Sequence, residues 1–191
     1  MAFLSASELL KIPFKKLGIN VKISDKVSIY EPEKIEIGDY SRIDDFSVIS
    51  GKIKIGSFVH LAVFSNLAGG SEGIVLDDFS GLAYGCHVFS QSDDYSGHSL
   101  TNPTVPDKYK KETKKMVYIG KHCIVGTSSV IFPGVHLAEG TAVGAGAVVT
   151  KSTQEWSIYV GNPAKKIKNR SKELLKLEQD FLAELNNIEK E

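Results

Sequence analysis

The sequence predicts an all-β fold, a parallel β-helix in which short strands are joined by tight corners. Its main sign is an aliphatic residue at every sixth position, at Ile119, Val125, Ile131, Leu137, Val143 and Val149. The same spacing occurs earlier, at Ile37, Ile43, Ile49, Ile55, Leu61 and Leu67, and then at Leu76, Leu82 and Val88. A period of six fits neither a 3.6-residue helix nor one long alternating strand. Three six-residue segments per turn fit the stacked coils of a solenoid.

Two further positions of the repeat support this fold. Glycine follows the aliphatic residue at several corners, where a permissive backbone is needed: Gly38, Gly56, Gly120, Gly126 and Gly144. A small or β-branched residue comes four places after the aliphatic one, at positions that include Ser41, Ser65, Cys86, Cys123 and Thr141. We therefore interpret both cysteines as packing residues and expect no metal or redox site, because no CxxC motif accompanies them.

The N-terminal segment, residues 1–20, is expected to cover the open end of the first coil. Ser5 and Glu8 have the spacing of a capping box in front of Leu9, and Gly18 is a candidate stop for a short helix or turn. A terminal coil exposes unpaired backbone and apolar interior and so needs a cap.

The repeat is expected to span residues 21–160 with three irregularities. Two extra residues, Glu31–Pro32, precede Ile37, and a glycine-rich corner follows at residues 68–73. The largest break is a polar, proline-containing loop at 89–117. A loop of this length inside a compact repeat is usually functional or disordered. Residues 161–191 form a tail and a closing helix from about Ser171 to Glu189, whose apolar stripe includes Leu174, Phe181 and Ile188. We treat residues 1–191 as one domain.

Composition narrows the functional classes. The chain has 23 basic and 23 acidic residues, so no overall field favours nucleic acid or an anionic membrane. It has no 18-residue apolar run, and its first ten residues do not have the pattern of a signal peptide. We expect a cytoplasmic protein with neither a nucleic-acid nor a membrane partner.

The repeat is the hexapeptide signature, and the chain resembles the left-handed β-helix acyltransferases over about residues 20–170. This resemblance implies a homotrimer with acyl-CoA, as co-substrate and not as a permanently bound cofactor, in the groove between neighbouring subunits. It also implies that the last coils and the tail bind CoA, through Gly126, Ser128, Gly144, Gly146, Pro163, Lys165, Lys166 and Lys168. Lysines suit CoA phosphates. The glycines are explained equally well by the tight corners of the repeat without any ligand. The lysines could instead lie on a solvent-exposed surface in front of the helix.

The sugar O-acetyltransferases of this family carry a histidine base at the start of the long loop, but here that position falls in Ser90–Asp94, which has no histidine. The chain looks closer to the nucleotide-sugar N-acyltransferases that acylate dTDP-4-amino-4,6-dideoxyglucose. The segments that carry this likeness are Arg42–Phe46, Asp93–Gly97, Pro103–Pro106 and Trp156–Gly161. A deprotonated amine is already nucleophilic, so such an enzyme needs orientation and electrostatic help more than a strong base.

Candidate site residues follow from this comparison. Asp94, with Asp93 beside it, replaces the expected histidine and could orient the sugar amine, although an Asp-Asp pair in a loop also suits a turn. His60 is a further catalytic candidate. Glu72, Tyr84 and His87 are candidates for substrate binding, with Tyr84 able to stack on thymine.

The sequence thus predicts transfer of an acetyl or small hydroxyacyl group from acyl-CoA to the amine of a nucleotide-linked deoxyamino sugar, in the synthesis of surface glycans. One alternative is a sugar O-acetyltransferase with His60, His87 or His98 as base. Another is a non-catalytic or metal-binding solenoid. The sequence leaves open the acyl group, the sugar, the nucleotide, the amine position, and which of Asp93 and Asp94 acts.

Overall fold

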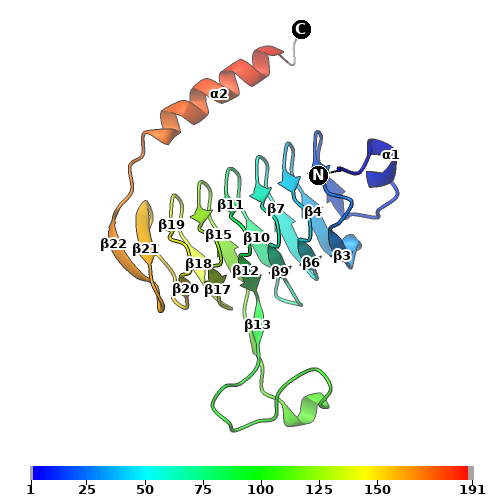
Figure 1. The fold of residues 1–191 in the computed structure, drawn as a ribbon, viewed down its shortest axis with the longest axis vertical. Helices are drawn as coiled ribbons and strands as arrows, with labels where there is room; N and C mark the ends of the chain where they lie inside the picture. Colours follow the sequence, from blue (N-terminus) through cyan, green and yellow to red (C-terminus); the bar gives the residue numbers. More distant parts are fainter. Residues whose placement is uncertain (1, 189–191) are drawn as a thin grey trace.

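The computed structural model describes residues 2–188 and forms a three-sided parallel β-helix (Figure 1). The first face contains β1 (Lys16–Leu17), β4 (Ile35–Ile37), β7 (Ile53–Ile55), β10 (Ile74–Leu76), β15 (Val117–Ile119) and β18 (His136–Leu137). The second face contains β2 (Lys22–Ile23), β5 (Arg42–Ile43), β8 (His60–Leu61), β11 (Gly81–Leu82), β16 (Ile124–Val125), β19 (Ala142–Val143), β21 (Ser157–Val160) and β22 (Lys165–Asn169). The third face contains β3 (Ser28–Tyr30), β6 (Val48–Ser50), β9 (Asn66–Ala68), β12 (His87–Phe89), β17 (Val130–Ile131) and β20 (Val148–Val149). We call the edges between faces one and two, two and three, and three and one the first, second and third corners.

The six-residue period places the aliphatic residues inside the prism. Ile119, Val125, Ile131 and Leu137 are completely buried, and their neighbours in the repeat are almost so. The small residues four places later also point inward, and their hydroxyls satisfy backbone groups of the adjacent coil. Ser129 Oγ, for example, donates to the Gly144 carbonyl at 2.9 Å. The predicted interior of the β-helix is therefore confirmed.

The N-terminal cap is shorter than the sequence suggested. Helix α1 covers only Ala6–Leu9, and its predicted capping box is present: Glu8 and Ser5 bond each other's backbone N–H. Gly18 does not end this helix. It follows β1, which already pairs with β4, and a side chain on Gly18 would collide with the backbone of Asp39. The first face therefore begins at Lys16, before the expected start of the repeat.

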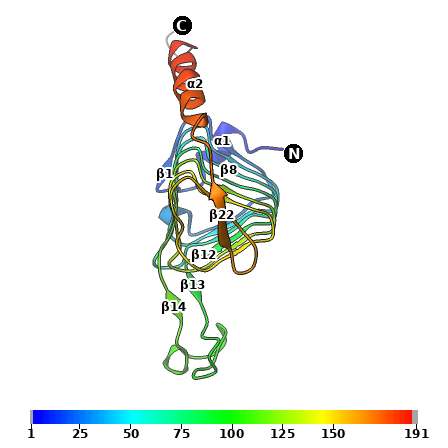
Figure 2. The same cartoon turned by 90° about the vertical axis from the view of Figure 1, so that its left-hand side faces the viewer.

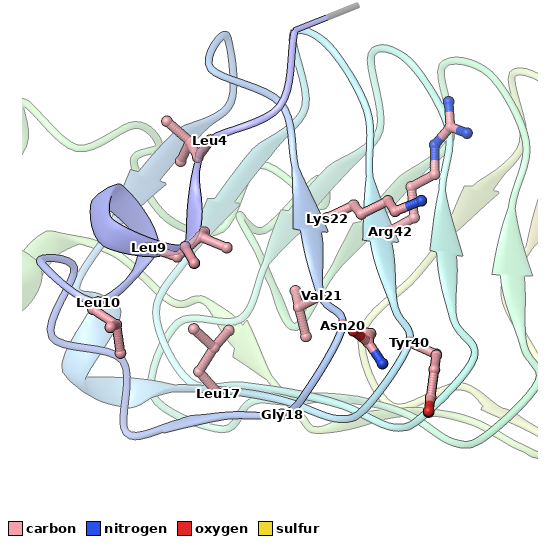
Figure 3. A pocket seen from close by; sticks show the side chains of 11 residues that line it. Leu4, Leu9, Leu10, Leu17, Gly18, Asn20, Val21, Lys22, Tyr40 and Arg42 are labelled. Carbon is pink, nitrogen blue, oxygen red and sulfur yellow. The ribbon is translucent and has the colours of Figure 1, made fainter. Parts of the chain in front are cut away.

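The open end beneath this cap is hollow. A pocket of about 750 Å³ lies there. Figure 3 shows the apolar side chains that line it, which include Leu4, Leu9, Leu10, Leu17 and Val21. None of the predicted site residues lines it. The pocket reflects the exposed interior of a terminal coil, which the cap covers only in part.

The long loop stands on a two-stranded stalk that the sequence did not reveal. Strands β13 (Gln91–Ser92) and β14 (Thr113–Lys114) pair in antiparallel fashion and carry the loop away from the third corner (Figure 2). Beyond the stalk, residues Asp107–Tyr109 form a 3-10 helix. The loop and the C-terminal helix project from opposite sides of the prism in both views.

The C-terminal tail adds a strand before its helix. Strand β22 runs antiparallel to β21 and extends the second face. Helix α2 then spans Leu174–Ile188, close to the prediction, although Glu189 lies outside the described residues. It does not close the solenoid: Figure 1 shows it leaving the prism, and Leu177 and Phe181 are 67% and 42% exposed. Within residues 2–188, no helix is long and apolar enough to cross a membrane.

Candidate active site

Asp94 is held by the loop that carries it. Its two carboxylate oxygens accept hydrogen bonds from the backbone N–H of Ser96 at 2.9 Å, the Ser96 hydroxyl at 2.8 Å and the Ser99 hydroxyl at 3.1 Å. These bonds, those from Ser96 first, lower the pKa of Asp94. The side chain is half-buried, so this charged and oriented carboxylate is still partly exposed at the loop surface.

The neighbouring Asp93 has a structural partner. Its carboxylate accepts a hydrogen bond of 3.3 Å from the backbone N–H of Asn102, which ties the start of the loop to its far side. The Ser96 hydroxyl also lies 2.7 Å from His98 Nδ1, so His98 belongs to the same network as Asp94. Of the two aspartates, Asp94 has the more complete set of orienting bonds.

His60 lies on the second face, in a network that the sequence reading missed. Its Nε2 is 2.8 Å from Asp44, and the same carboxylate accepts a 2.6 Å bond from Arg42 Nε. Asp44 is only 7% exposed, whereas His60 is 51% exposed. Arg42 and His60 are one coil apart, eighteen residues, and their strands pair directly. The eighteen-residue spacing was therefore a signal in the sequence that could have predicted that Arg42 and His60 lie side by side.

The three predicted substrate-binding residues are spread over two corners. Tyr84 stands at the second corner with 60% of its surface exposed, and His87 begins β12 just beyond it. Glu72 lies in the glycine-rich extension at the third corner, where the Ser71 hydroxyl donates to it at 3.2 Å. The 530 Å³ cavity between α2 and the second face includes His60 but none of these three residues. One protomer therefore does not assemble the predicted residues into a single pocket.

The predicted CoA-binding glycines differ in their surroundings. A side chain on Gly126 would meet the backbone of Ala145, and one on Gly144 would meet Val160, so close packing alone explains both. Gly146 has a φ of +67°, and nothing lies within 4 Å of a Cβ added to it. Ser128 occupies the same corner of the preceding coil and has a φ of +58°. The second corner is thus open along Ser128 and Gly146, where a ligand could approach the backbone.

The predicted basic residues of the tail lie on one added strand. Lys165, Lys166 and Lys168 belong to β22 and are exposed, and Lys166 Nζ donates to Gln154 at 2.9 Å. Pro163 lies in the turn between β21 and β22. This strand pairs with β21, which in turn pairs with β19, the strand that leads into Gly144. The cationic side chains therefore lie at the same end of the second face.

A second network missed from the sequence anchors α2. His122 is 6% exposed and lies between the rings of Phe79 and Trp156. Its Nε2 is 2.9 Å from Glu178, which also pairs with Lys121 at 2.6 Å. The helix that buries this histidine is far away in sequence, which explains why the repeat pattern alone gave no sign of it.

Both cysteines are buried, and burial raises the pKa of the Cys123 thiol to about 11. Within residues 2–188, no group of three or more histidine, cysteine or acidic side chains is arranged to hold a metal ion.

The sequence and the structure were compared with those of known proteins. No family profile matches the sequence. A dTDP-4-amino-4,6-dideoxy-D-glucose acyltransferase from Escherichia coli is 41% identical over 184 residues, which cover 95% of each chain. The chain belongs to the hexapeptide-repeat nucleotide-sugar N-acyltransferases.

Solved structures of this family show the same left-handed β-helix. The Bacillus cereus N-acyltransferase AntD, in complex with dTDP and 3-hydroxybutyryl-CoA, is 46% identical with a TM-score of 0.95, over 96% of this chain and 98% of AntD. A serine-to-alanine mutant of AntD, in complex with dTDP-4-amino-4,6-dideoxyglucose and CoA, has the same identity, TM-score and coverage. The protein is therefore an acyl-CoA-dependent acyltransferase.

Proposed function

We propose that this protein transfers an acyl group from acyl-CoA to the 4-amino group of dTDP-4-amino-4,6-dideoxyglucose. The observation that carries the proposal is the near full-length likeness to AntD, whose structures hold that nucleotide sugar together with CoA. The acyl group is acetyl or a small hydroxyacyl, and the complex of AntD with 3-hydroxybutyryl-CoA supports the second. Its use in surface-glycan synthesis and its cytoplasmic location stay predictions from the sequence.

Asp94 is proposed to orient the sugar amine. Three hydrogen bonds fix its carboxylate, and the lowered pKa keeps it ionised at neutral pH. Asparagine and alanine mutants of an aspartate in AntD form complexes with dTDP and CoA, so loss of that carboxylate does not prevent either ligand from binding in that relative. Asp93 supports the loop through Asn102, and Glu72, Tyr84 and His87 are proposed to line the sugar side.

The proposed chemistry needs no strong base. The neutral amine attacks the thioester carbon, so that a C–N bond forms and the C–S bond breaks. The proton lost by nitrogen passes to the departing sulfur, which leaves as the CoA thiol. Orientation of the two substrates supplies the main rate gain.

CoA is proposed to lie along the second corner. Its pantetheine arm would follow Gly126, Ser128, Gly144 and Gly146, and its phosphates would meet Lys165, Lys166 and Lys168 beyond the turn at Pro163. The open surface above Gly146 and the exposure of the three lysines support this placement.

The active form is proposed to be a homotrimer. Asp94 belongs to the loop between β13 and β14, and this loop stands outside the prism of its own chain (Figure 2). The open corner and His60 belong to the prism itself. A neighbouring copy would bring a loop and a corner together, and three-fold closure suits a three-sided body.

One observation favours a hydroxyl acceptor instead. His60 and Asp44 form the base-and-orienter pair that hydroxyl activation uses. An acceptor panel with acetyl-CoA separates the two reactions by measuring thiol release. We expect turnover with dTDP-4-amino-4,6-dideoxyglucose and little with maltose or with the 4-hydroxy analogue, dTDP-6-deoxyglucose. Preference for a hydroxyl acceptor would replace the N-acyltransferase assignment, and absence of thiol release with every acceptor would contradict both.

A further inference from the structure

A single hydroxyl joins Asp94 to a histidine. Ser96 Oγ lies 2.8 Å from Asp94 Oδ2 and 2.7 Å from His98 Nδ1. The backbone N–H of His98 also donates to this oxygen at 3.3 Å, which holds the histidine beside the serine. Carboxylate, hydroxyl and imidazole thus form a short chain at the start of the long loop, and one end of that chain is the carboxylate proposed to orient the sugar amine.

The number of protons in this chain sets the direction of each hydrogen bond. A serine hydroxyl has one proton, and an ionised carboxylate can only accept. Since the lowered pKa keeps Asp94 ionised at neutral pH, the Ser96 proton lies in the bond to Asp94. The contact between Ser96 Oγ and His98 Nδ1 is then a hydrogen bond only if Nδ1 carries a proton. His98 is therefore the donor, either as the neutral Nδ1–H tautomer or as the imidazolium.

The other neutral tautomer of His98 would break this arrangement. With its proton on Nε2, the ring presents a lone pair at Nδ1, and the Ser96 hydroxyl could donate to His98 or to Asp94 but not to both. Of the three bonds to the Asp94 carboxylate, the one from the Ser96 hydroxyl is the shortest. The tautomer of His98 therefore decides whether Asp94 keeps its shortest bond.

His98 differs in this respect from the other histidines that lie near a carboxylate. His60 Nε2 is 2.8 Å from Asp44 and His122 Nε2 is 2.9 Å from Glu178, so both meet the acid directly. Within residues 2–188, the bond to Ser96 is the one hydrogen bond of the His98 ring. A donating Nδ1 cannot also accept a proton, so the geometry at this nitrogen suits positioning better than general-base catalysis.

We propose that His98 is a positioning residue for acyl transfer: its Nδ1–H turns the Ser96 hydroxyl onto Asp94 and so fixes the carboxylate that holds the sugar amine. His98 itself does not touch the substrate. The inference rests on the proposed function, because it needs Asp94 to be the group that orients the amine. It gives His98 a role different from that of the base that a hydroxyl acceptor would need.

Nitrogen NMR of the protein with isotope-labelled histidine tests the proton count directly. Above the pH at which His98 loses its charge, its ring should be the Nδ1–H tautomer. In Ser96→Ala the acceptor is absent, so the ring should shift toward the Nε2–H tautomer, which is the favoured form of a free histidine side chain. His136, which begins β18 on the first face, is the internal control and should give the same signal in both proteins. An Nε2–H ring at His98 in the parent would overturn the inference.

Kinetics with the amino sugar measure the effect on catalysis. His98→Phe removes the donor and should lower kcat/KM several-fold, up to about 10-fold, because a single hydrogen bond has an effect of this size. His98→Asn can place an amide N–H near the position of Nδ1 and should retain most of the rate. Acyl-CoA binding should be unchanged in both variants. His136→Phe is the matched control and should behave as the parent.

A double-mutant cycle separates positioning from a general effect on the loop. If His98 acts through Ser96, His98→Phe should have no further effect in a protein that already carries Ser96→Ala. Fully additive losses would contradict the inference, and so would loss of all turnover in both His98 variants with a hydroxyl acceptor preferred by the parent. A parent that acylates no amino sugar overturns the proposed function, whereas normal acylation by a parent with an Nε2–H ring at His98 overturns this inference alone.

Discussion

Asp94 illustrates how a residue can be prepared for a role by its own loop. Three donors from Ser96 and Ser99 converge on one carboxylate, so both its charge and its direction are fixed before any substrate arrives. A general base would need a pKa near the working pH, and the pKa of Asp94 is lowered instead. The local structure therefore suits orientation of an amine better than removal of a proton.

Replacing Asp94 should reduce catalysis without affecting CoA. Asp94→Asn removes the charge and turns an amide N–H₂ toward groups that donate hydrogen bonds. We expect kcat/KM for the amino sugar to fall on the order of 10²-fold, because misplacement of a reactant has an effect of that size. Acyl-CoA binding, measured by calorimetry, should persist. Asp107→Asn in the same loop is the control and should behave as the parent; equal rates for Asp94→Asn and the parent would exclude the proposed role.

The pH profile should report the substrate amine. Asp94 stays ionised above the acid range because its pKa is lowered, so the rise in rate from neutral to alkaline pH must come from loss of the substrate ammonium proton. This rising limb should remain in His60→Asn and His87→Asn. Its disappearance, together with loss of turnover, in either variant would identify that histidine as a base and favour the hydroxyl-acceptor reaction.

At the scale of elements, α2 is attached by a few specific contacts. Phe181 packs on the rings of the first corner, and Glu178 meets Lys121 and His122. Burial opposes ionisation of Glu178, but the hydrogen bonds from Lys121 and His122 outweigh it and lower the pKa. Arg170 strengthens the approach to the helix by donating to the carbonyls of His122 and Gly140. The rest of the helix extends beyond the prism.

Loss of the Glu178 charge should loosen this helix selectively. Glu178→Gln should cost about 1–2 kcal/mol of local stability and speed amide hydrogen exchange in α2, with the coils unaffected. Since the folded pKa lies below the ordinary value of 4.5, the stabilisation is present above about pH 4.5 and is lost as pH falls through the folded pKa. Glu184→Gln, on the exposed side of the same helix, should show no such change. Equal rates of amide hydrogen exchange in α2 of Glu178→Gln and Glu184→Gln would contradict the role of Glu178 in attaching the helix.

At the scale of the whole molecule, stability is a sum over stacked coils. Each coil of the repeat buries aliphatic residues from all three faces, and its backbone bonds the coils on either side. A defect in a middle coil therefore disturbs two interfaces at once.

A buried charge in a middle coil should unfold the prism locally. Ile131→Asp removes a completely buried side chain worth roughly 1.5–3 kcal/mol and adds an unpaired carboxylate to the interior. We expect a large fall in melting temperature by circular dichroism. The control Ile124→Asp, at a half-exposed position of the neighbouring strand, should melt close to the parent. A parental melting curve for Ile131→Asp would mean that the inward register is wrong.

Activity should depend on assembly. Within a single chain, the loop that carries Asp94 and the open second corner lie apart. An isolated protomer therefore lacks a complete site under the proposed arrangement. Light scattering coupled to size exclusion should show that thiol release follows the trimer alone. A fully active monomer would refute the shared site.

The sequence alone determined the solenoid, because a strict six-residue period leaves few other ways to bury Ile119, Val125 and Ile131. It also located the loop and, through resemblance, the family. Tertiary structure decided the contacts between coils and those of the tail: the pairing of His60 with Asp44, the burial of His122 under α2, the antiparallel strand β22 and the exposed Phe46–Phe64 pair. Each of these results from stacking one coil on another or from folding a tail back on the prism. A repeat pattern predicts which side chains point inward. Contacts between outward side chains depend on how the coils and the tail pack against each other.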